Sequence, residues 1–310
     1  MAYVVSSLPD YTEQPEKVIY NKIFSLSPVL EVIKSNGNLM VGVKSAQTIN
    51  IVNTEGVWQA QGCSFNPSGD TTYTQRTVTV GKPKIDLEFC ERDLETKFTQ
   101  QALVKGSEYT SLTYNTEIMD DVMQKAAKRQ MTAIWQGDTA SLNAYLNKYD
   151  GLVKIIGAAT IGGTYSGTAW SEANSRVVLK GLANLIIADQ DVYKGGQTTI
   201  KFYMSPAMRA AYVFKLITDN LFNIDPKDGQ GKVYVEGTTI EIIGDPGLSG
   251  LNYIYAIEDE NLYGATDMLN EEERVESWFS QDNRKVRVNI EWKFGVNVAF
   301  PSRVYRYLGV

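Results

Sequence analysis

Histidine, the residue used most often for proton transfer near neutral pH, is absent from the sequence. Its unperturbed pKa suits it to act as a general base, and its ring nitrogens make it a common metal ligand. Catalysis of the Ser-His-Asp or Cys-His kind is therefore excluded. Only carboxylate or lysine chemistry remains possible.

Carboxylates that could do chemistry gather at three places in the sequence. The run 271–273 in "NEEER", and Asp189 with Asp191 in "DQD", could bind a hard cation through oxygen. Acidic runs are more often solvated faces, and we interpret them so. Asp120 and Asp121 are adjacent in an expected helix, about 100° apart around its axis, and cannot easily converge as an acid–base pair. We therefore predict no metal site and no catalytic residue.

Two glycine-rich stretches and two cysteines give no stronger signal. "GGTYSG" and "GDPGLSG" lack the Lys-Ser/Thr that follows a phosphate-binding P-loop, and we interpret both as turns. Cys63 and Cys90 are too few and too far apart for a disulfide framework or a zinc site. We expect buried, reduced cysteines, no cofactor and no enzymatic activity.

The composition is that of an ordinary globular protein. The 310 residues are 43% hydrophobic and 21% charged, enough for a substantial core. The net charge of -6 has the wrong sign for a protein whose main work is neutralising phosphates. No apolar run approaches the ~20 residues of a membrane helix, and the start lacks signal-peptide features. We expect a chain that is soluble and intracellular when made.

A long amphipathic helix is predicted at about 116–136. Thr116 can cap its start and Gly137 its end. Lys125, Lys128 and Arg129 lie opposite the apolar stripe, where they could touch DNA or form a solvated face. At the α-helical rise, residues 117–135 would span roughly 28 Å. The apolar stripe comprises Ile118, Met119, Val122, Met123, Ala126, Ala127, Met131, Ile134 and Trp135.

The first third of the chain is predicted to be extended or projecting. Residues 1–38 carry Pro9, Pro15 and Pro28 among polar residues, which favours an extended arm. Strand-like segments at 39–52 and 74–89 surround a polar tip and suggest a long hairpin. Because an isolated hairpin is marginal in water, it needs a partner. A short helix is predicted from about residue 93 to 106.

The rest of the chain alternates strands and helices. A flexible connection at 157–169 precedes a helix near Ser171, and Ser205 with Pro206 marks another helix start. Short strands are predicted near 232–243 and 252–258. Strict alternation over 286–300 predicts one strand of roughly 50 Å, which forms a terminal hairpin against the long helix.

Several phrases and their order resemble the major capsid proteins of tailed bacteriophages with the Hong Kong 97-type fold. They are the long helix ending in "IWQGDT", then "YDGLVKII", "YMSPAMRAAYVFKLI" and the long alternating strand. The resemblance covers nearly the whole chain and implies an α+β fold. It divides the chain into an N-terminal arm (1–38), an E-loop hairpin (39–85), a peripheral domain with the spine helix (86–150 and 268–310), and an axial domain (151–267).

The resemblance implies a structural subunit that assembles with copies of itself into pentamers and hexamers of an icosahedral head around double-stranded DNA. It implies a virion protein assembled in the bacterial host cytoplasm, without membrane contact. Portal and decoration proteins are implied partners, and any scaffolding protein would be separate because no scaffolding segment precedes the arm. Candidate contacts between subunits are Tyr11, Lys44, Trp58, Phe65 and Arg76.

Some family members cross-link a hairpin lysine to an asparagine of another subunit. Lys44 lies in the hairpin region, but its favoured interpretation is a solvated strand lysine. Two other functions stay open. An encapsulin-type nanocompartment would share the fold and enclose a cargo enzyme, and a carboxylate-dependent hydrolase would need an acidic cleft.

Overall fold

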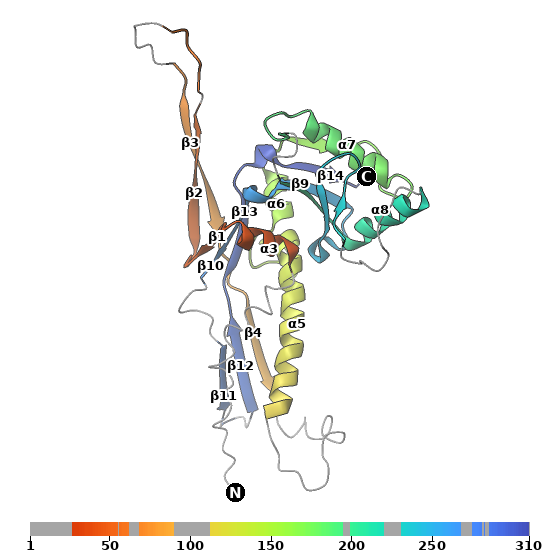
Figure 1. The fold of residues 1–310 in the computed structure, drawn as a ribbon. Coiled ribbons are helices and arrows are strands. Elements are labelled where there is room, and N and C mark those ends of the chain that lie inside the picture. The colour runs from red at the N-terminus through yellow and green to blue at the C-terminus, as the bar shows by residue number, and fades with distance from the viewer. Residues whose placement is uncertain are drawn as a thin grey trace.

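The computed structural model shows an elongated molecule with a compact lobe on one side (Figure 1). A long hairpin projects from one end, and a long helix with strands beside it forms the other end. The residues described are 27–54, 56–61, 68–89, 112–194, 199–219, 231–267, 275–280, 282 and 285–309.

The predicted long helix is α5, Leu112–Gln136. Its start is earlier than expected, so Thr116 lies inside the helix and is not its N-cap. Its end at Gly137 is as predicted, and glycine is required there, since a Cβ would lie 2.5 Å from the Tyr149 carbonyl oxygen. At about 1.5 Å per residue the helix is roughly 38 Å long. Among the described residues, no helix is long and apolar enough to cross a membrane.

A three-stranded antiparallel sheet of order β11-β12-β4 lies beside α5. Val288 and Ile290 of this sheet share one buried cluster with Met123 and Ala126 of α5. The helix and the sheet therefore cover each other's apolar faces, as the terminal-hairpin prediction required. The strands are β4 (Lys84–Phe89), β11 (Val275–Ser280) and β12 (Lys285–Glu291).

The single strand predicted over 286–300 is wrong, because the chain changes sheets within it. β12 ends at Glu291, and β13 (Phe294–Val298) begins after a short break. Beyond the break, β13 pairs with β10 (Leu262–Thr266), which also pairs in parallel with β1 (Leu39–Val41). Both strands keep the same apolar face inward, so the alternation continues across the break.

The extended arm predicted for 1–38 is wrong for its last part. Residues Pro28–Ser35 form α3, with Ser27 at the N-cap position and Pro28 at the first helical position. Its apolar face enters the main core, where the buried side chains are Val29, Leu30, Val32 and Ile33. Residues 1–26 lie outside the described part of the chain.

The compact lobe is built on a mixed six-stranded sheet of order β5-β14-β9-β6-β8-β7. Its strands are β5 (Gly163–Tyr165), β6 (Ile200–Met204), β7 (Val233–Tyr234), β8 (Glu241–Gly244), β9 (Tyr253–Glu258) and β14 (Tyr305–Leu308). The helices of the lobe are α6 (Leu152–Ala158), α7 (Ser175–Ile187) and α8 (Pro206–Thr218). As predicted, Ser205 caps α8 by accepting a hydrogen bond from the Met208 backbone N–H at 3.3 Å.

Both faces of this sheet are buried, by different helices. Phe202 and Ile254 belong to the cluster that contains α7 and α8. The adjacent Tyr203 and Tyr255 belong to the cluster that contains α5 and α6. Successive side chains of a strand point to opposite faces, so the sheet lies between the two helix pairs. The lobe is thereby fixed to the end of α5, where Trp135 stacks on Tyr255 with ring centroids 5.5 Å apart.

The last strand, β14, belongs to the sheet of this lobe, although the sequence division placed residues 268–310 in the other domain. The domain boundaries otherwise stay a prediction. The helix expected at 93–106, both cysteines and the acidic run 271–273 lie outside the described residues.

Candidate assembly surfaces

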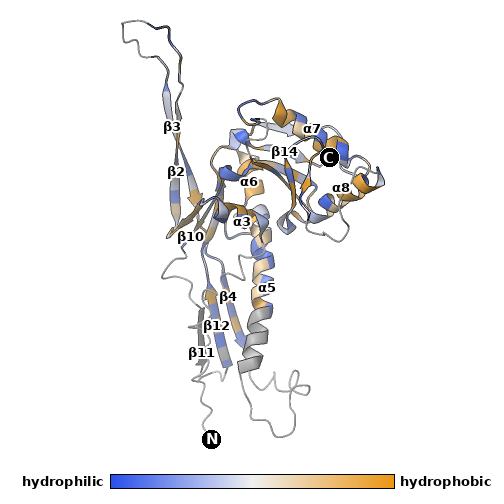
Figure 2. Cartoon of the chain, viewed as in Figure 1, coloured by the Kyte–Doolittle hydropathy of each residue, from blue (hydrophilic) through white to orange (hydrophobic). Residues whose placement is uncertain are grey.

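The projecting hairpin is a two-stranded ribbon of β2 (Ala46–Thr54) and β3 (Thr71–Thr79), paired along their whole length. Threonine, valine and isoleucine favour extended backbone, which explains why this polar segment is strand. Among the β3 side chains, Val78 alone is buried. Figure 2 shows the ribbon in mainly hydrophilic or neutral colours, with hydrophobic residues near its base. Most of the ribbon therefore has no core of its own.

The base of the hairpin is held firmly to the body. Asn297 of β13 donates to the Thr77 carbonyl at 2.7 Å and accepts from the Arg76 guanidinium at 3.3 Å. Desolvation by burial lowers the pKa of Arg76. Val43, Val78, Val80 and Ala265 form a small cluster beneath these contacts. The ribbon thus leaves the body in a fixed direction.

Four large apolar side chains are exposed along the ribbon and its tip. Trp58 is 99% exposed and Tyr73 is 75% exposed, and Val52 and Val57 are at least half exposed. The two limbs of the tip are joined by a hydrogen bond from the Gln59 amide to the Ser68 hydroxyl. Solvent-exposed aromatic residues on a projecting segment are typical of surfaces that bind another protein.

The predicted contact residues fall at different places. Trp58 is exposed at the tip, Lys44 is exposed just before β2, and Arg76 is partly buried at the base. The structure does not bring these three together. Tyr11 and Phe65 lie outside the described residues, so their contacts stay a prediction.

A second exposed surface, which the sequence did not indicate, lies on the loop 138–150 after α5. Leu142 is 103% exposed and Tyr145 is 55% exposed. The guanidinium of Arg129 lies over the Tyr145 ring, 3.9 Å from its centroid. The segment "SLNAYLNKYD" contains several apolar residues, which is the only signal in the sequence for this surface. The structure shows that Leu142 and Tyr145 face outward while Tyr149 is buried.

Three charged residues fix the shape of this loop. The Lys154 ammonium bridges Asp138 at 2.6 Å and Asp150 at 2.7 Å. Hydrogen bonds from Lys154 and the Ala140 backbone lower the pKa of Asp138. Burial opposes ionisation of Asp150, but hydrogen bonds from Lys154 and Thr139 outweigh it and lower its pKa. The loop therefore has a definite conformation although most of it is exposed.

The outer face of α5 beside this loop is basic. Lys125 pairs with Asp121 at 2.6 Å, one helical turn away. Arg129 contacts Tyr145, as described, and Lys128 is exposed. The alternatives of a DNA-contacting or a solvated face both remain compatible with this arrangement.

The residues weighed for chemistry do not converge in the described part of the chain. Asp189 accepts a hydrogen bond from the Tyr305 hydroxyl and a second one from the Asp191 backbone N–H. The second bond stabilises a local turn. The hydrogen bond from Tyr305 lowers the pKa of Asp189. No group of three or more His, Cys, Asp or Glu suited to a metal ion occurs among the described residues. The side chain of Asp120 lies outside the description.

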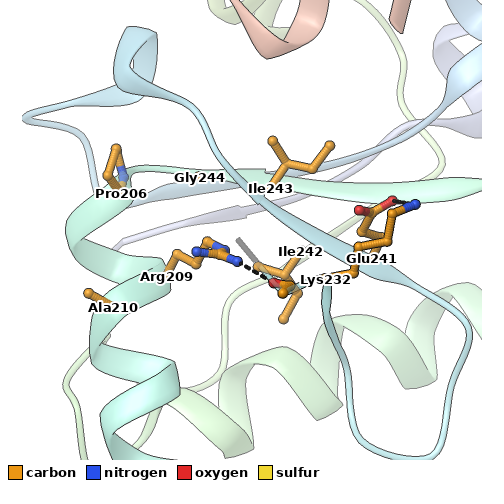
Figure 3. Close-up of a pocket in the computed structure, with 9 residues that line it drawn as sticks. Pro206, Arg209, Ala210, Lys232, Glu241, Ile242, Ile243 and Gly244 are labelled. Carbon is orange, nitrogen blue, oxygen red and sulfur yellow. Dashed lines mark hydrogen bonds and ion pairs between the residues drawn. The ribbon is translucent and has the colours of Figure 1, made fainter. Parts of the chain in front are cut away.

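One shallow pocket of about 280 Å³ lies between α8 and β8 (Figure 3). Its charged groups already have partners within the chain. Arg209 donates to the Gly231 carbonyl at 3.1 Å, and Lys232 lies 3.7 Å from Glu241. The lining supplies one carboxylate, whereas acid–base catalysis by carboxylates needs two groups with different pKa values. This pocket is not the acidic cleft that a hydrolase would need.

No family model matches the sequence, and a search of the curated proteins found no match. Solved structures do match the fold. The capsid of Myoviridae phage XM1 has a TM-score of 0.56 at 14% identity, covering 90% of this chain and 92% of that chain. The procapsid of satellite phage P4, which includes its size determination protein, has a TM-score of 0.56 at 11% identity, covering 94% and 90%. The capsid of a native GTA particle has a TM-score of 0.56 at 12% identity, covering 90% of each chain.

These matches span nearly the whole of both chains, so the likeness is one of architecture and not of a shared motif. The chain has the fold of viral capsid subunits. More specifically, the α+β, Hong Kong 97-type fold implied by the sequence resemblance is confirmed.

Proposed function

We propose that this chain is the major capsid protein of a tailed bacteriophage. Copies of it assemble into pentamers and hexamers of an icosahedral head that encloses double-stranded DNA. The observation that carries the proposal is the long hairpin, whose contacts with the other described residues lie at its base and which presents Trp58 and Tyr73 to solvent. A projecting ribbon of this kind gains its stabilising contacts from another subunit.

The fold supports the same function. Exposed apolar side chains occur on the hairpin, on the loop 138–150 and on α8 of the lobe, where Phe214 and Ile217 are exposed. Different surfaces that meet head to tail generate closed rings of subunits. Several weak contacts made at once give a stable shell, because each raises the effective concentration of the others.

The proposed role is structural and not enzymatic. The sequence lacks histidine, and several of the described carboxylates, such as Asp138, Asp219 and Asp245, serve ion pairs or a helix cap. The proposed partners beyond copies of itself are portal and decoration proteins, a separate scaffolding protein and the packaged DNA. The proposed location is the virion, after assembly in the bacterial host cytoplasm.

Negative-stain microscopy of the expressed full chain tests this function. The expected result is closed, tail-less shells or ordered sheets of capsomers, with a separate scaffolding protein supplied if the chain alone gives only capsomers. A homogeneous monomer at high concentration, with and without scaffolding protein, would contradict the proposal. Shells that retain a cargo enzyme from the host would instead support the nanocompartment alternative.

A further inference from the structure

Four buried polar groups cluster at the junction between α5 and the lobe. They are the Ser27 hydroxyl, the Trp135 indole N–H, the Tyr203 hydroxyl and the Oδ2 atom of Asp245, none of which makes a hydrogen bond of ordinary geometry within the described part of the chain. Ser27 is 2% exposed, and the other three residues are 0% exposed. Buried polar groups almost always have a partner, so four such groups in one place indicate that something other than the chain satisfies them.

The four groups come from segments that are distant in the sequence. Ser27 precedes α3, Trp135 lies in the last turn of α5, Tyr203 lies in β6 and Asp245 follows β8. The Trp135 and Tyr203 rings have centroids 5.6 Å apart. The Gly247 backbone N–H donates to Asp245 Oδ1 at 2.7 Å, and a Cβ at Gly247 would lie 2.5 Å from the Trp135 ring. The fold therefore brings these side chains to one junction.

The Asp245 carboxyl connects the groups electrostatically. Burial raises the pKa of Asp245, and the Trp135 indole N–H and the Val29 backbone N–H, in the first turn of α3, are near enough to oppose that rise. Burial also raises the pKa of Tyr203, and nearby carboxylates, including Asp245, raise it further. Ser27 lies beside the same first turn, at the N-cap position. Polar groups that are this close and yet not directly bonded have the spacing that a bridging molecule spans.

The chemistry of the junction selects an uncharged ligand with both donors and acceptors. The Trp135 and Val29 N–H groups donate, which opposes a bound cation. The Asp245 carboxylate accepts, which opposes a bound anion. The hydroxyls of Ser27 and Tyr203 can donate or accept. Water has two donors and two acceptors, and a buried water commonly makes two to four hydrogen bonds to groups that would otherwise be unsatisfied.

We propose that the junction of α3, α5 and the lobe is a binding site for one internal water. The water accepts hydrogen bonds from the Trp135 indole N–H and the Tyr203 hydroxyl, and donates to Asp245 Oδ2 and the Ser27 hydroxyl oxygen. One shared ligand thus joins α3 and α5 to the lobe. The inference concerns the single folded chain and does not depend on the proposed function.

Nuclear magnetic resonance of the unassembled full chain tests the site. The tryptophan indole nitrogens are isotope-labelled, and each signal is assigned by replacing one tryptophan with phenylalanine. A long-lived internal water should give a nuclear Overhauser effect between water and the Trp135 indole proton. Trp292 is the matched control, because its indole is also buried but donates to Gln130 at 3.2 Å, so it should show no effect. No effect at either indole would overturn the proposal.

Hydroxyl protons that exchange with solvent give the same kind of signal, so a variant must remove them. Tyr203→Phe combined with Ser27→Ala leaves no hydroxyl of the proposed site beside the indole. The effect at Trp135 should remain, because the water keeps its bonds to Trp135 and Asp245. Loss of the effect in this variant, with the Trp292 signal unchanged, would assign it to the hydroxyls and contradict the water site.

The stability of Tyr203→Phe gives a second test, in which the sign of the change decides. If the hydroxyl is bonded to the internal water, its removal should raise the unfolding equilibrium constant of the unassembled subunit by about fivefold. Removal of a buried hydroxyl that has no partner should instead lower this constant. Tyr253→Phe, at a partly exposed position of the same sheet, is the control and should change the constant by less than about twofold. A Tyr203→Phe chain as stable as the unsubstituted chain, or more stable, would contradict the site.

Discussion

Gln130 of α5 accepts a hydrogen bond from the Trp292 indole at 3.2 Å and donates one to the Tyr149 hydroxyl at 2.9 Å. Gln130 and Trp292 are both buried. A single amide therefore connects α5 to Trp292, which follows β12, and to the loop that follows the helix. Burial raises the pKa of Tyr149, so the side chain is a neutral phenol whose oxygen accepts this bond.

Replacing Gln130 with leucine should destabilise the unassembled subunit by about 1–3 kcal/mol, because the Trp292 N–H and the Tyr149 hydroxyl are then buried without a partner. Denaturant unfolding at subunit concentrations below assembly measures this. Gln124→Leu, on the exposed side of the same helix, is the matched control and should change stability by less than about 0.5 kcal/mol. Equal stability of the two variants would show that the Gln130 network contributes nothing.

Gly247 lets the short helix Pro246–Leu248 pack directly on α5. A Cβ at this position would contact the Met131 carbonyl oxygen and the Trp135 ring at impossible distances. Gly247→Ala should therefore lower the melting temperature by several degrees and loosen the lobe from the helix. Gly56→Ala is the control, since a Cβ there meets nothing within 4 Å. An unchanged melting temperature for Gly247→Ala would show that Pro246–Leu248 can move away from α5 at little cost in stability.

Asp245 gives a pH dependence whose sign follows from its burial. Its carboxylate accepts a hydrogen bond from the Gly247 backbone at 2.7 Å. Burial raises its pKa above the ordinary 3.8, more than the nearby Trp135 indole and backbone N–H groups lower it. The folded state then binds the proton more tightly than the unfolded state. The protonated Asp245 therefore stabilises the fold fully below about pH 4, and this stabilisation is lost as the pH rises through the folded-state pKa.

Asp245→Asn removes this loss, since the amide does not ionise. The stability of the variant relative to the unsubstituted chain should therefore increase as the pH rises from about 4, by about 1.4 kcal/mol for each pH unit until the folded pKa is reached. Unfolding of the unassembled subunit between pH 3.5 and 8 measures the difference. A difference that is constant with pH would rule out a raised pKa at Asp245.

Asn297→Ala should loosen the hairpin at its base, because the Thr77 carbonyl and the Arg76 guanidinium both lose a partner. Hydrogen exchange of the β3 amides in the unassembled subunit should become faster by about tenfold, as expected for a loss of about 1.4 kcal/mol. Asn289→Ala, on β12, is the control and should leave β3 unchanged. The same exchange rate in both variants would show that the base is held by its apolar cluster alone.

Local signals in the sequence predicted the helices well where their ends are chemically marked. Gly137 ends α5 as expected, because no other residue fits against the Tyr149 carbonyl. Ser205 and Pro206 begin α8, also as expected. The same signal at Ser27 and Pro28 begins α3, but there proline was interpreted as a mark of extended chain. The Ser-Pro helix start was therefore present in the sequence, but the polar residues around it favoured the interpretation as an extended arm.

Tertiary contacts decided what local patterns could not. Alternation over 286–300 records which face is buried, but not that the chain leaves one sheet after Glu291 and enters another at Phe294. The exposed tip was predicted as a contact surface from the projecting hairpin alone. The exposed surface on the loop 138–150 was not predicted, because the loop conformation that exposes Leu142 depends on ion pairs of Lys154 with Asp150, one helical turn away, and with Asp138 at the other end of the loop.

The central claim is that the hairpin tip is left exposed in one chain so that a second copy can cover it. Oxidative footprinting of Trp58 in unassembled subunits and in purified shells tests it most directly, with the buried Trp135 as the internal reference. The account predicts that Trp58, 99% exposed in the single chain, is oxidised rapidly in subunits and is protected by at least about tenfold in shells. Equal oxidation of Trp58 in both states would contradict it.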